Sequence, residues 1–408
     1  MRRHASLGLA AMLTVALAAC GPADTPDAWL GAVTPVENPA LPGSRYPHLA
    51  VGGGTVVMSW LQALPEGGFA LQHAQWRDGA WSPAATVTRG ADWFVNWADF
   101  PSVVPMNATT WAAHWLQQKP GSVYSYDVRI AVSSDGGASW SAAMSPHDDG
   151  TPTEHGFVSL FEARGGTQAV WLDGRHTGGG HDHADGASGA MTLRSATIGR
   201  DGWRVGPDQE LDARVCDCCQ TDAAVTADGP IVVYRDRSGQ EVRDIAAVRL
   251  VADRWSEPVH VHADGWQVDA CPVNGPAVDA RGRTVAVAWF TAADLPRVRV
   301  AFSEDAGQTF SPPIEVASGD VTGRVDVALL DDGRAVVSWL QPSADGAEIR
   351  AQPFNRAGPA GAPLTVAAST VQRASGFPQM VRAGGGLLFA WTDAGEPSRV
   401  RTAYATLP

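Results

Sequence analysis

The fragment Val336-Val337-Ser338-Trp339-Leu340-Gln341 decides the fold, because its pattern recurs along the chain. It is an apolar run that ends in an aromatic residue and is followed two positions later by a polar one. Seven such segments occur at intervals of 50 to 63 residues, with the aromatic residues Trp60, Trp115, Trp171, Tyr234, Trp289, Trp339 and Trp391. A short apolar run and a turn marked by Gly or Asp precede each segment. This period is typical of a β-propeller, in which every repeat forms one blade of four antiparallel strands.

Composition agrees with an all-β globular protein. The 408 residues are 45% hydrophobic and 18% charged, and they include 44 Gly, 28 Pro and 16 Trp, which favours a turn-rich chain with a large core. The formal net charge is −13, so the protein is expected to repel phosphate backbones, and nucleic acid is not an expected partner. No run of 18 apolar residues is present, so no membrane-spanning helix is expected.

Two turns share a longer motif. Residues 133–140 (SSDGGASW) and 303–310 (SEDAGQTF) match the Asp-box, Ser-x-Asp-x-Gly-x-x-aromatic, in which the carboxylate accepts backbone N–H groups of its own turn and Gly adopts a positive φ. Through these motifs, residues 44–408 resemble the Asp-box (BNR-repeat) sialidase superfamily of β-propellers. Sialidases have six blades, whereas seven repeats are present here. We therefore predict a seven-bladed propeller, with the six-bladed sialidase fold as the alternative.

Closure of the ring involves both ends of the chain. The last repeat, over about 377–393 and 399–407, has room for only three strands. We predict that residues 28–36 supply its missing outer strand, so that residues 28–408 form a single propeller domain.

The N-terminus predicts a lipoprotein. Arg2 and Arg3 precede an apolar run from Leu7 to Ala19, as in a secretory signal. Residues 17–21 (LAACG) resemble the lipobox of bacterial lipoproteins, which implies a signal peptide over 1–19, a lipidated Cys20 and a tether over 20–27. The resemblance implies lipid anchoring in the bacterial cell envelope, at the outer membrane because Gly21 is not the Asp that retains such proteins at the inner one. The alternative is an ordinary secretory signal with a chance Cys.

The sialidase resemblance also indicates where a site would lie. In that family the active site is on the face made by the loops between the second and third strands and by the connections between blades. Converging arginines there pair with the carboxylate of an acid sugar, and a Tyr assisted by a carboxylate acts as the nucleophile. The catalytic candidates on this face are Arg175, Arg235 and Arg243 as the arginine cluster, and Tyr234 with Asp236 or Asp244 as the nucleophile pair.

Further polar residues on the same face are candidates for substrate binding, namely Arg45, Asp99, His155, Asp173 and Asn274. Residues 44–47 (SRYP) match the Phe/Tyr-Arg-Ile-Pro motif of sialidases poorly, which puts the first arginine of that family in doubt. The alternative interpretation is that Tyr234 replaces a core Trp and that the charges form a paired, solvated rim.

Two function classes follow from these features. One is a surface-anchored, glycan-directed glycosidase of the exo-sialidase type. The other is a non-catalytic propeller that binds a glycan or a periplasmic or surface protein. We expect a monomer that contacts the membrane only through its N-terminal lipid.

Four cysteines besides Cys20 are concentrated in two connections, as Cys216, Cys218, Cys219 and Cys271. In an exported protein they predict two disulfides, and because adjacent cysteines do not easily bond each other, Cys218 or Cys219 is expected to reach Cys271. The alternative is a soft metal such as Zn or Cu(I) held by the thiolates. A metal-binding or redox protein that uses these cysteines is thus a third function class. No other cofactor is expected.

Overall fold

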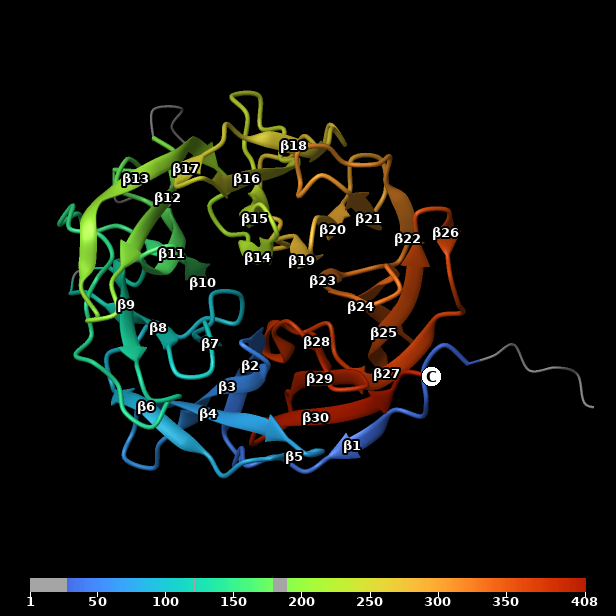
Figure 1. Cartoon of the computed structure of the whole chain (residues 1–408), viewed down its shortest axis with the longest axis horizontal. Coiled ribbons are helices and arrows are strands. Elements are labelled where there is room, and N and C mark those ends of the chain that lie inside the picture. The colour runs from blue at the N-terminus through green and yellow to red at the C-terminus, as the bar shows by residue number, and fades with distance from the viewer. Residues whose placement is uncertain (1–27, 121, 179–188) are drawn as a thin grey trace, which may run out of the picture.

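Seven β-sheets are arranged in a ring around a central axis (Figure 1) in the computed structural model, which describes residues 28–120, 122–178 and 189–408. The first blade contains β2 (Ser44–Gly52), β3 (Thr55–Ala63), β4 (Phe69–Arg77), β5 (Ala80–Trp81) and β6 (Ala85–Gly90). The second contains β7 (Ser102–Pro105), β8 (Trp111–Gln118) and β9 (Tyr126–Ser133). The third contains β10 (His155–Ala163), β11 (Gly166–Asp173), β12 (Met191–Ile198) and β13 (Arg204–Val215).

The second half of the ring repeats this plan. The fourth blade contains β14 (Asp222–Thr226), β15 (Gly229–Arg235), β16 (Ile245–Val251), β17 (Arg254–Trp255) and β18 (Val259–His262). The fifth contains β19 (Ala277–Arg281), β20 (Thr284–Thr291), β21 (Arg297–Ser303) and β22 (Ile314–Ser318). The sixth contains β23 (Gly323–Leu329), β24 (Ala335–Ser343), β25 (Gly346–Asn355), β26 (Gly358–Pro359) and β27 (Leu364–Ser369). The seventh contains β28 (Gln379–Ala383), β29 (Gly386–Asp393), β30 (Arg399–Thr406) and β1 (Thr34–Val36).

The seventh blade joins the two ends of the chain. β1 pairs antiparallel with β30, with Thr34 opposite Tyr404 and Val36 opposite Thr402. The predicted seven blades and the predicted closing strand are therefore confirmed. The predicted plan of four-stranded antiparallel blades is confirmed, and the described sheet of the second blade has three strands. An isolated bridge between Ile130 and Met144 stands where the fourth strand would pair.

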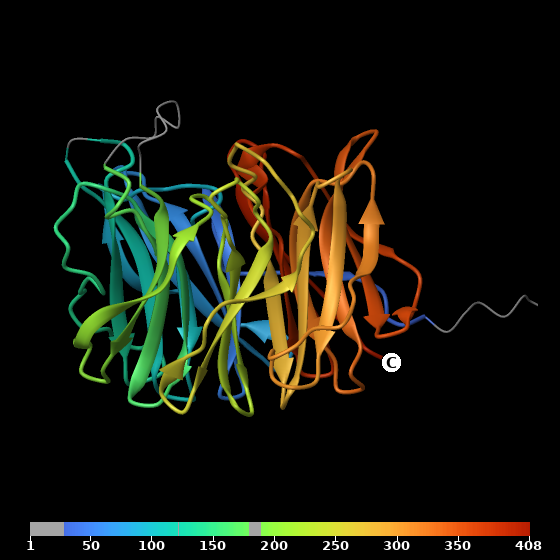
Figure 2. The same ribbon diagram turned by 90° about the horizontal axis from the view of Figure 1, so that it is seen from above.

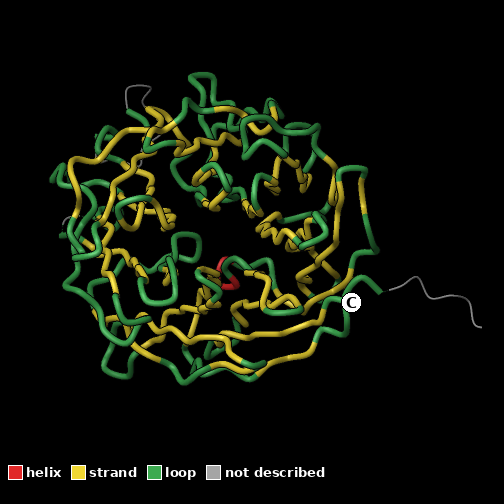
Figure 3. Tube along the Cα trace, in the orientation of Figure 1, coloured by secondary structure: helices red, strands yellow, loops and turns green. Residues whose placement is uncertain are grey.

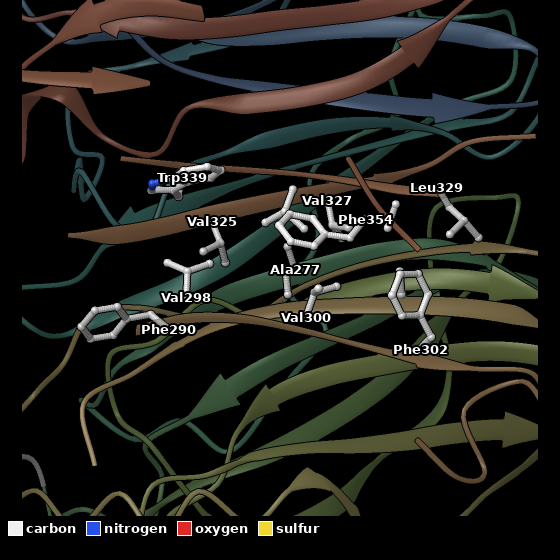
Figure 4. Packing of buried hydrophobic residues seen from close by; sticks show 14 of the residues in the cluster. Ala277, Phe290, Val298, Val300, Phe302, Val325, Val327, Leu329, Trp339 and Phe354 are labelled. Atoms are coloured by element: carbon white, nitrogen blue, oxygen red, sulfur yellow. The ribbon is translucent and has the colours of Figure 1, made fainter. Parts of the chain in front are cut away.

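Apolar side chains pack between the blades, each of which runs from one face of the disc to the other (Figure 2). Between the fifth and sixth blades, Val300 and Phe302 of β21 lie close to Val327 of β23 and Phe354 of β25 (Figure 4). All four are almost inaccessible to solvent. Of the repeated aromatic residues, Trp60, Trp171, Tyr234 and Trp289 are completely buried as well. The seven-fold sequence pattern is thus the pattern of the core.

The two Asp-box turns have matching hydrogen bonds. Asp135 Oδ1 accepts the Ser139 N–H at 2.8 Å, and Asp305 Oδ1 accepts the Thr309 N–H at 2.9 Å. In the first turn Gly137 has a φ of 85°, and a Cβ at this position would collide with the ring of Trp111. The turn therefore requires Gly both for its backbone conformation and for its packing against the neighbouring strand.

Helical structure in the described residues is limited to the 3-10 turn η1 (Arg373–Ser375), close to the axis (Figure 3). The described part of the chain has no helix with the length and apolar character needed to cross a bilayer.

Neighbouring innermost strands are joined by aspartates. Asp222 of β14 accepts the N–H of Val278 of β19 at 2.7 Å, and Asp279 of β19 accepts that of Leu329 of β23 at 2.7 Å. Asp326 of β23 joins the sixth and seventh blades in the same way, because its carboxylate accepts the N–H of Met380 of β28 at 2.6 Å. The second oxygen of each carboxylate accepts the N–H of the next residue in its own strand. Each carboxylate therefore fixes the position of one blade relative to the next.

Asp99 makes a similar connection between the second and third blades. Its carboxylate accepts the N–H of Phe157 at 2.8 Å and the Tyr126 hydroxyl at 3.3 Å, and the residue is 2% exposed. Burial raises the pKa of Asp99 from 3.8 to about 7. Asp99, predicted to bind substrate, thus holds two blades together.

We expect the substitution Asp99→Asn to remove a pH dependence of stability. A carboxyl whose pKa is raised on folding stabilises the protein at pH below 4, and this contribution is lost as the pH rises to about 7. Each unit of the raised pKa corresponds to about 1.4 kcal/mol. Asn keeps an oxygen for the Phe157 N–H and an amide for the Tyr126 oxygen. Urea unfolding at pH 4.5 and pH 8 should show a smaller loss of stability at the higher pH in the variant. An equal loss in both proteins would contradict this role.

Candidate functional site

One face of the disc carries the strand 2–3 loops and the connections between blades, and we call it the upper face. The ends of the strands place Asp173, at the end of β11, and His155, at the start of β10, opposite each other on this face. The connection from the second to the third blade contributes His147 and Asp149, and β9 contributes Asp127. Side chains from four neighbouring segments therefore converge at the top of the third blade.

Asp149 is the centre of this arrangement. Its carboxylate lies 3.0 Å from His155 Nε2 and 3.2 Å from His147 Nδ1. The two imidazoles are stacked, with ring centroids 3.8 Å apart and an angle of 6° between their planes. The free Nε2 of His147 is buried without a hydrogen-bond partner. We call His147, Asp149, His155, Asp127 and Asp173 the blade-three network.

The stacked histidines have different protonation behaviour. Burial lowers the pKa of His147, helped by the charge of His155. Burial acts on His155 in the same direction, but its hydrogen bond to Asp149 and the charge of Asp173 outweigh it and raise the pKa of His155 above 6.5. The two pKa shifts therefore have opposite signs, and His155 takes up a proton at a higher pH than His147 does.

Arg175 closes one side of the network. Its guanidinium forms two bonds of 2.7 Å to Asp173, which is completely buried, and two of 3.3 Å to Asp208 of β13. Trp171 donates its indole N–H to the same Asp173 carboxylate at 2.8 Å. The carboxylate of Asp208 also accepts a bond of 2.7 Å from Arg194. Arg175 is thus held by two carboxylates of its own blade, and its Nη2 also lies 3.6 Å from the Asp149 carboxylate.

The fourth blade pairs its predicted catalytic residues with other groups. The Tyr234 hydroxyl donates to Asp212 of β13 at 2.6 Å, not to Asp236 or Asp244. Asp236 lies 3.1 Å from His260, while the Asp244 carboxylate accepts the backbone N–H groups of residues 265 and 266. The predicted nucleophile pair is therefore not assembled in this structure. Tyr234 instead occupies the core position of the repeated Trp.

Arg235 and Arg243 are buried in the same blade. Arg235 is 1% exposed and donates four hydrogen bonds of 2.7–3.0 Å to the backbone carbonyl oxygens of Arg243, Asn274 and Phe290. The Trp266 ring lies 4.8 Å from its guanidinium carbon. Arg243 is also 1% exposed and pairs with Glu241 at 2.9 Å. Arg175, Arg235 and Arg243 thus do not converge on a common pocket, because each is bound by separate partners.

Two remaining candidates have structural contacts. The Asn274 side chain accepts the Arg324 N–H at 2.8 Å and donates to the Thr322 carbonyl oxygen at 3.2 Å. Arg45 stacks on the Phe69 ring at 5.5 Å, and its Nε is buried without a hydrogen-bond partner. Of the five predicted substrate-binding residues, only His155 and Asp173 lie together, in the blade-three network.

The predicted disulfides are not formed. Cys216, Cys218, Cys219 and Cys271 are free thiols, and the Sγ atoms of Cys216 and Cys219 are 3.1 Å apart, beyond the length of a disulfide bond. The sequence nevertheless correctly predicts that the two connections are neighbours, since the thiols of Cys218 and Cys271 interact. Burial opposes ionisation of Cys216. Hydrogen bonds with Cys218 and Cys219 and the charge of Arg243 nevertheless lower its pKa well below 9. Cys20 lies outside the described residues.

His147, Asp149, Asp127 and Asp208 were not predicted from the sequence. A signal for two of them exists in residues 146–150 (PHDDG), a polar run that shortly precedes His155. The pattern of the strands gave no reason to single it out, because it belongs to an irregular connection. Asp208 lies on an outer strand, where an alternating acidic residue normally indicates only a solvated face.

Comparisons with known proteins show a similarity of fold and no match in sequence. Neither a protein-family model nor a curated protein sequence matches the chain. Among solved structures, the phage phi92 endosialidase matches with a TM-score of 0.50 at 10% identity, over 93% of this chain and 69% of that one. The Trypanosoma rangeli sialidase in complex with the inhibitor DANA matches with a TM-score of 0.47 at 13% identity, over 79% of this chain and 56% of that one. The Hadza microbial sialidase Hz136 matches with a TM-score of 0.39 at 13% identity, over 72% of this chain and 63% of that one. The chain shares its propeller fold with the phage phi92 endosialidase.

We expect the substitution Arg235→Met to destabilise the protein by about 3–5 kcal/mol, because it leaves three buried carbonyl oxygens without their donors. Arg164→Met is the control, since that side chain is 87% exposed and forms a single surface ion pair. Denaturant unfolding of both variants measures the difference. Equal stability of the two variants would show that Arg235 is not a structural residue.

Proposed function

We propose that this chain is a glycan-directed propeller of the sialidase type, and that it binds its glycan on the upper face over the second and third blades. The observation that carries the proposal is the blade-three network. Carboxylates, imidazoles and a guanidinium are held there in fixed positions by ion pairs, so they are preorganised to bind a polar ligand. The phage phi92 endosialidase, which has the same fold, is a glycan-directed protein by its name.

The accessible members of this surface define the ligand groups. Lys119 and Asp127 form an ion pair at 3.0 Å with side chains 26% and 23% exposed, and Arg175 is 14% exposed. Tyr124, in the same loop as Lys119, is 45% exposed. Carboxylates accept and ammonium or guanidinium groups donate hydrogen bonds to sugar hydroxyls, and an aromatic face packs against the apolar side of a sugar ring. The surface can therefore contact a saccharide through both kinds of interaction.

The pairing of the arginines argues for hydroxyl recognition. A sialidase needs guanidinium groups that are free to bind the carboxylate of the acid sugar. Arg175 is bound by Asp173 and Asp208, and Arg235 and Arg243 are buried in other contacts. We therefore propose a saccharide recognised mainly by its hydroxyl groups, not an acid sugar.

A glycosidase is the second candidate, and the stacked histidines favour it. Both stacked imidazoles lie within hydrogen-bond distance of the Asp149 carboxylate, and such an arrangement is suited to general acid–base catalysis. Carboxylate oxygens of Asp149 and Asp173 lie 3.0 and 3.7 Å from His155 Nε2, so both carboxylates are placed to exchange a proton with this imidazole.

Glycan binding can be tested on the full chain with the substitution Cys20→Ser. We expect it to bind saccharides on a glycan array, and Asp127→Asn to weaken binding about 10- to 100-fold through loss of a charged hydrogen-bond partner. Asp294→Asn is the matched control, because it removes a carboxylate from an ion pair in the upper-face loop of the fifth blade. Release of reducing sugar from the bound ligands would assign the glycosidase. Absence of saccharide binding, or an equal effect of both variants, would refute the proposed site.

We also propose that the propeller is anchored in the bacterial outer membrane by lipid at Cys20, as the lipobox resemblance implies. Cell fractionation should recover the natural chain with the membranes and the Cys20→Ser variant in the soluble periplasmic fraction. Membrane association of both would contradict lipid anchoring.

A further inference from the structure

Three thiols form a compact group on the upper face of the fourth blade. Cys216, Cys218 and Cys219 lie in the connection between β13 and β14, and their Sγ atoms are all within 4.8 Å of one another. Cys216 and Cys219 are buried, whereas Cys218 is partly exposed. The group is therefore reachable from solvent on one side and enclosed by protein on the other.

A fourth thiol approaches from the next blade. Cys271 lies in the connection between β18 and β19, is exposed, and interacts with the thiol of Cys218. Two connections that are about fifty residues apart in the sequence thus bring four thiols to one place. Ordinary packing does not require four sulfur atoms at the solvent-accessible end of a blade.

The charges around the thiols point to an anionic group. Arg243 Nη1 lies 3.4 Å from Cys216 Sγ. Arg235 hydrogen-bonds only to backbone carbonyl oxygens, and no carboxylate of a described residue lies within ion-pair distance of it. Two buried guanidinium groups therefore have one carboxylate, that of Glu241, within ion-pair distance. A buried cation needs a compensating anion, and the neighbouring thiols supply it when they ionise.

The connection itself is held by further ion pairs. Arg237 binds Asp217 at 2.9 Å and Glu241 at 2.9 Å, so the residue between Cys216 and Cys218 is fixed to the strand 2–3 loop of the same blade. The N–H of Cys216 donates to the carbonyl oxygen of Arg235 at 3.0 Å. The thiols are thus positioned before any ligand arrives.

We propose that Cys216, Cys218 and Cys219 bind one soft d10 metal ion, Zn²⁺ or Cu⁺, as thiolates. On binding, each coordinating thiol releases its proton to solvent and a metal–sulfur bond forms. Three thiolates suffice for Cu⁺, whereas Zn²⁺ in a structural site takes four ligands in a tetrahedron and requires Cys271 as well. In either case the complex has a net charge of −2, which the buried Arg235 and Arg243 neutralise.

The test uses the full chain with Cys20→Ser, so that only these four thiols remain. The reduced protein is loaded with Zn²⁺ or, under ascorbate, with Cu⁺, and the bound metal is measured by native mass spectrometry and by elemental analysis. We expect one ion per chain and a rise in the midpoint of thermal unfolding on loading. Cys271→Ser separates the two ions, because it should abolish stoichiometric Zn²⁺ binding and leave Cu⁺ binding intact.

Cys219→Ser should abolish binding of both ions. Cys219 is buried, so this substitution could prevent folding; Cys218→Ser, at a partly exposed position, then tests whether these thiols bind the metal. Near-ultraviolet circular dichroism checks that each variant is folded. Failure of the reduced protein to bind either ion would overturn the proposal. Undiminished binding in a folded Cys218→Ser, Cys219→Ser double variant would do so too, because the metal would then lie elsewhere.

Discussion

The hydrogen bonds between neighbouring innermost strands are the interaction on which this ring depends. Apolar packing between blades is non-directional and would tolerate sliding of one blade against the next. The carboxylates of Asp222, Asp279 and Asp326 remove that freedom, because each accepts one N–H from its own strand and one from the following blade. The connections between blades on the upper face lead directly into these strands. The geometry of any site on that face is therefore inherited from the contacts at the axis.

The same requirement for paired charges explains why arginines did not mark a binding pocket. A buried guanidinium must be surrounded by acceptors, and Arg235 obtains them from the backbone of its own and the next blade. Arg175 obtains them from two carboxylates of the third blade. In both cases the residue stabilises a strand end or a loop. An arginine on a propeller loop thus indicates a binding site for a substrate carboxylate only when few acceptor groups of the protein already bind its guanidinium.

Sequence repetition was sufficient to predict the propeller, its seven blades and the closing strand, because the core pattern recurs in every blade. It also indicated that Cys271 lies beside the Cys216–Cys219 segment, since equivalent connections of adjacent blades are neighbours. It could not predict that Tyr234 pairs with Asp212. That contact depends on the register of the long strand β13, which is irregular against β12 at several points.

Only two of the five residues of the blade-three network were predicted, for a similar reason. His155 and Asp173 lie at strand ends, where the repeat fixes their place. His147 and Asp149 belong to the connection after the second blade, whose described sheet has only three strands, so the repeat gives no position for them. Spacing in the sequence does not distinguish free thiols, disulfides and a metal site either, because the distances among the sulfur atoms depend on how the connection between the third and fourth blades is folded.

The pairing of β1 with β30 has a consequence for biosynthesis. Because the outermost strand of the seventh blade comes from residues 34–36 and its neighbour from residues 399–406, the ring cannot close until residues 399–406 have left the ribosome. Until then the first six blades form an open arc, and its two end blades expose the apolar faces that would pack against the seventh blade. The chain is therefore most exposed to aggregation before residues 399–406 have been made. Removal of this strand would prevent closure of the whole ring, in addition to the loss of the strand itself.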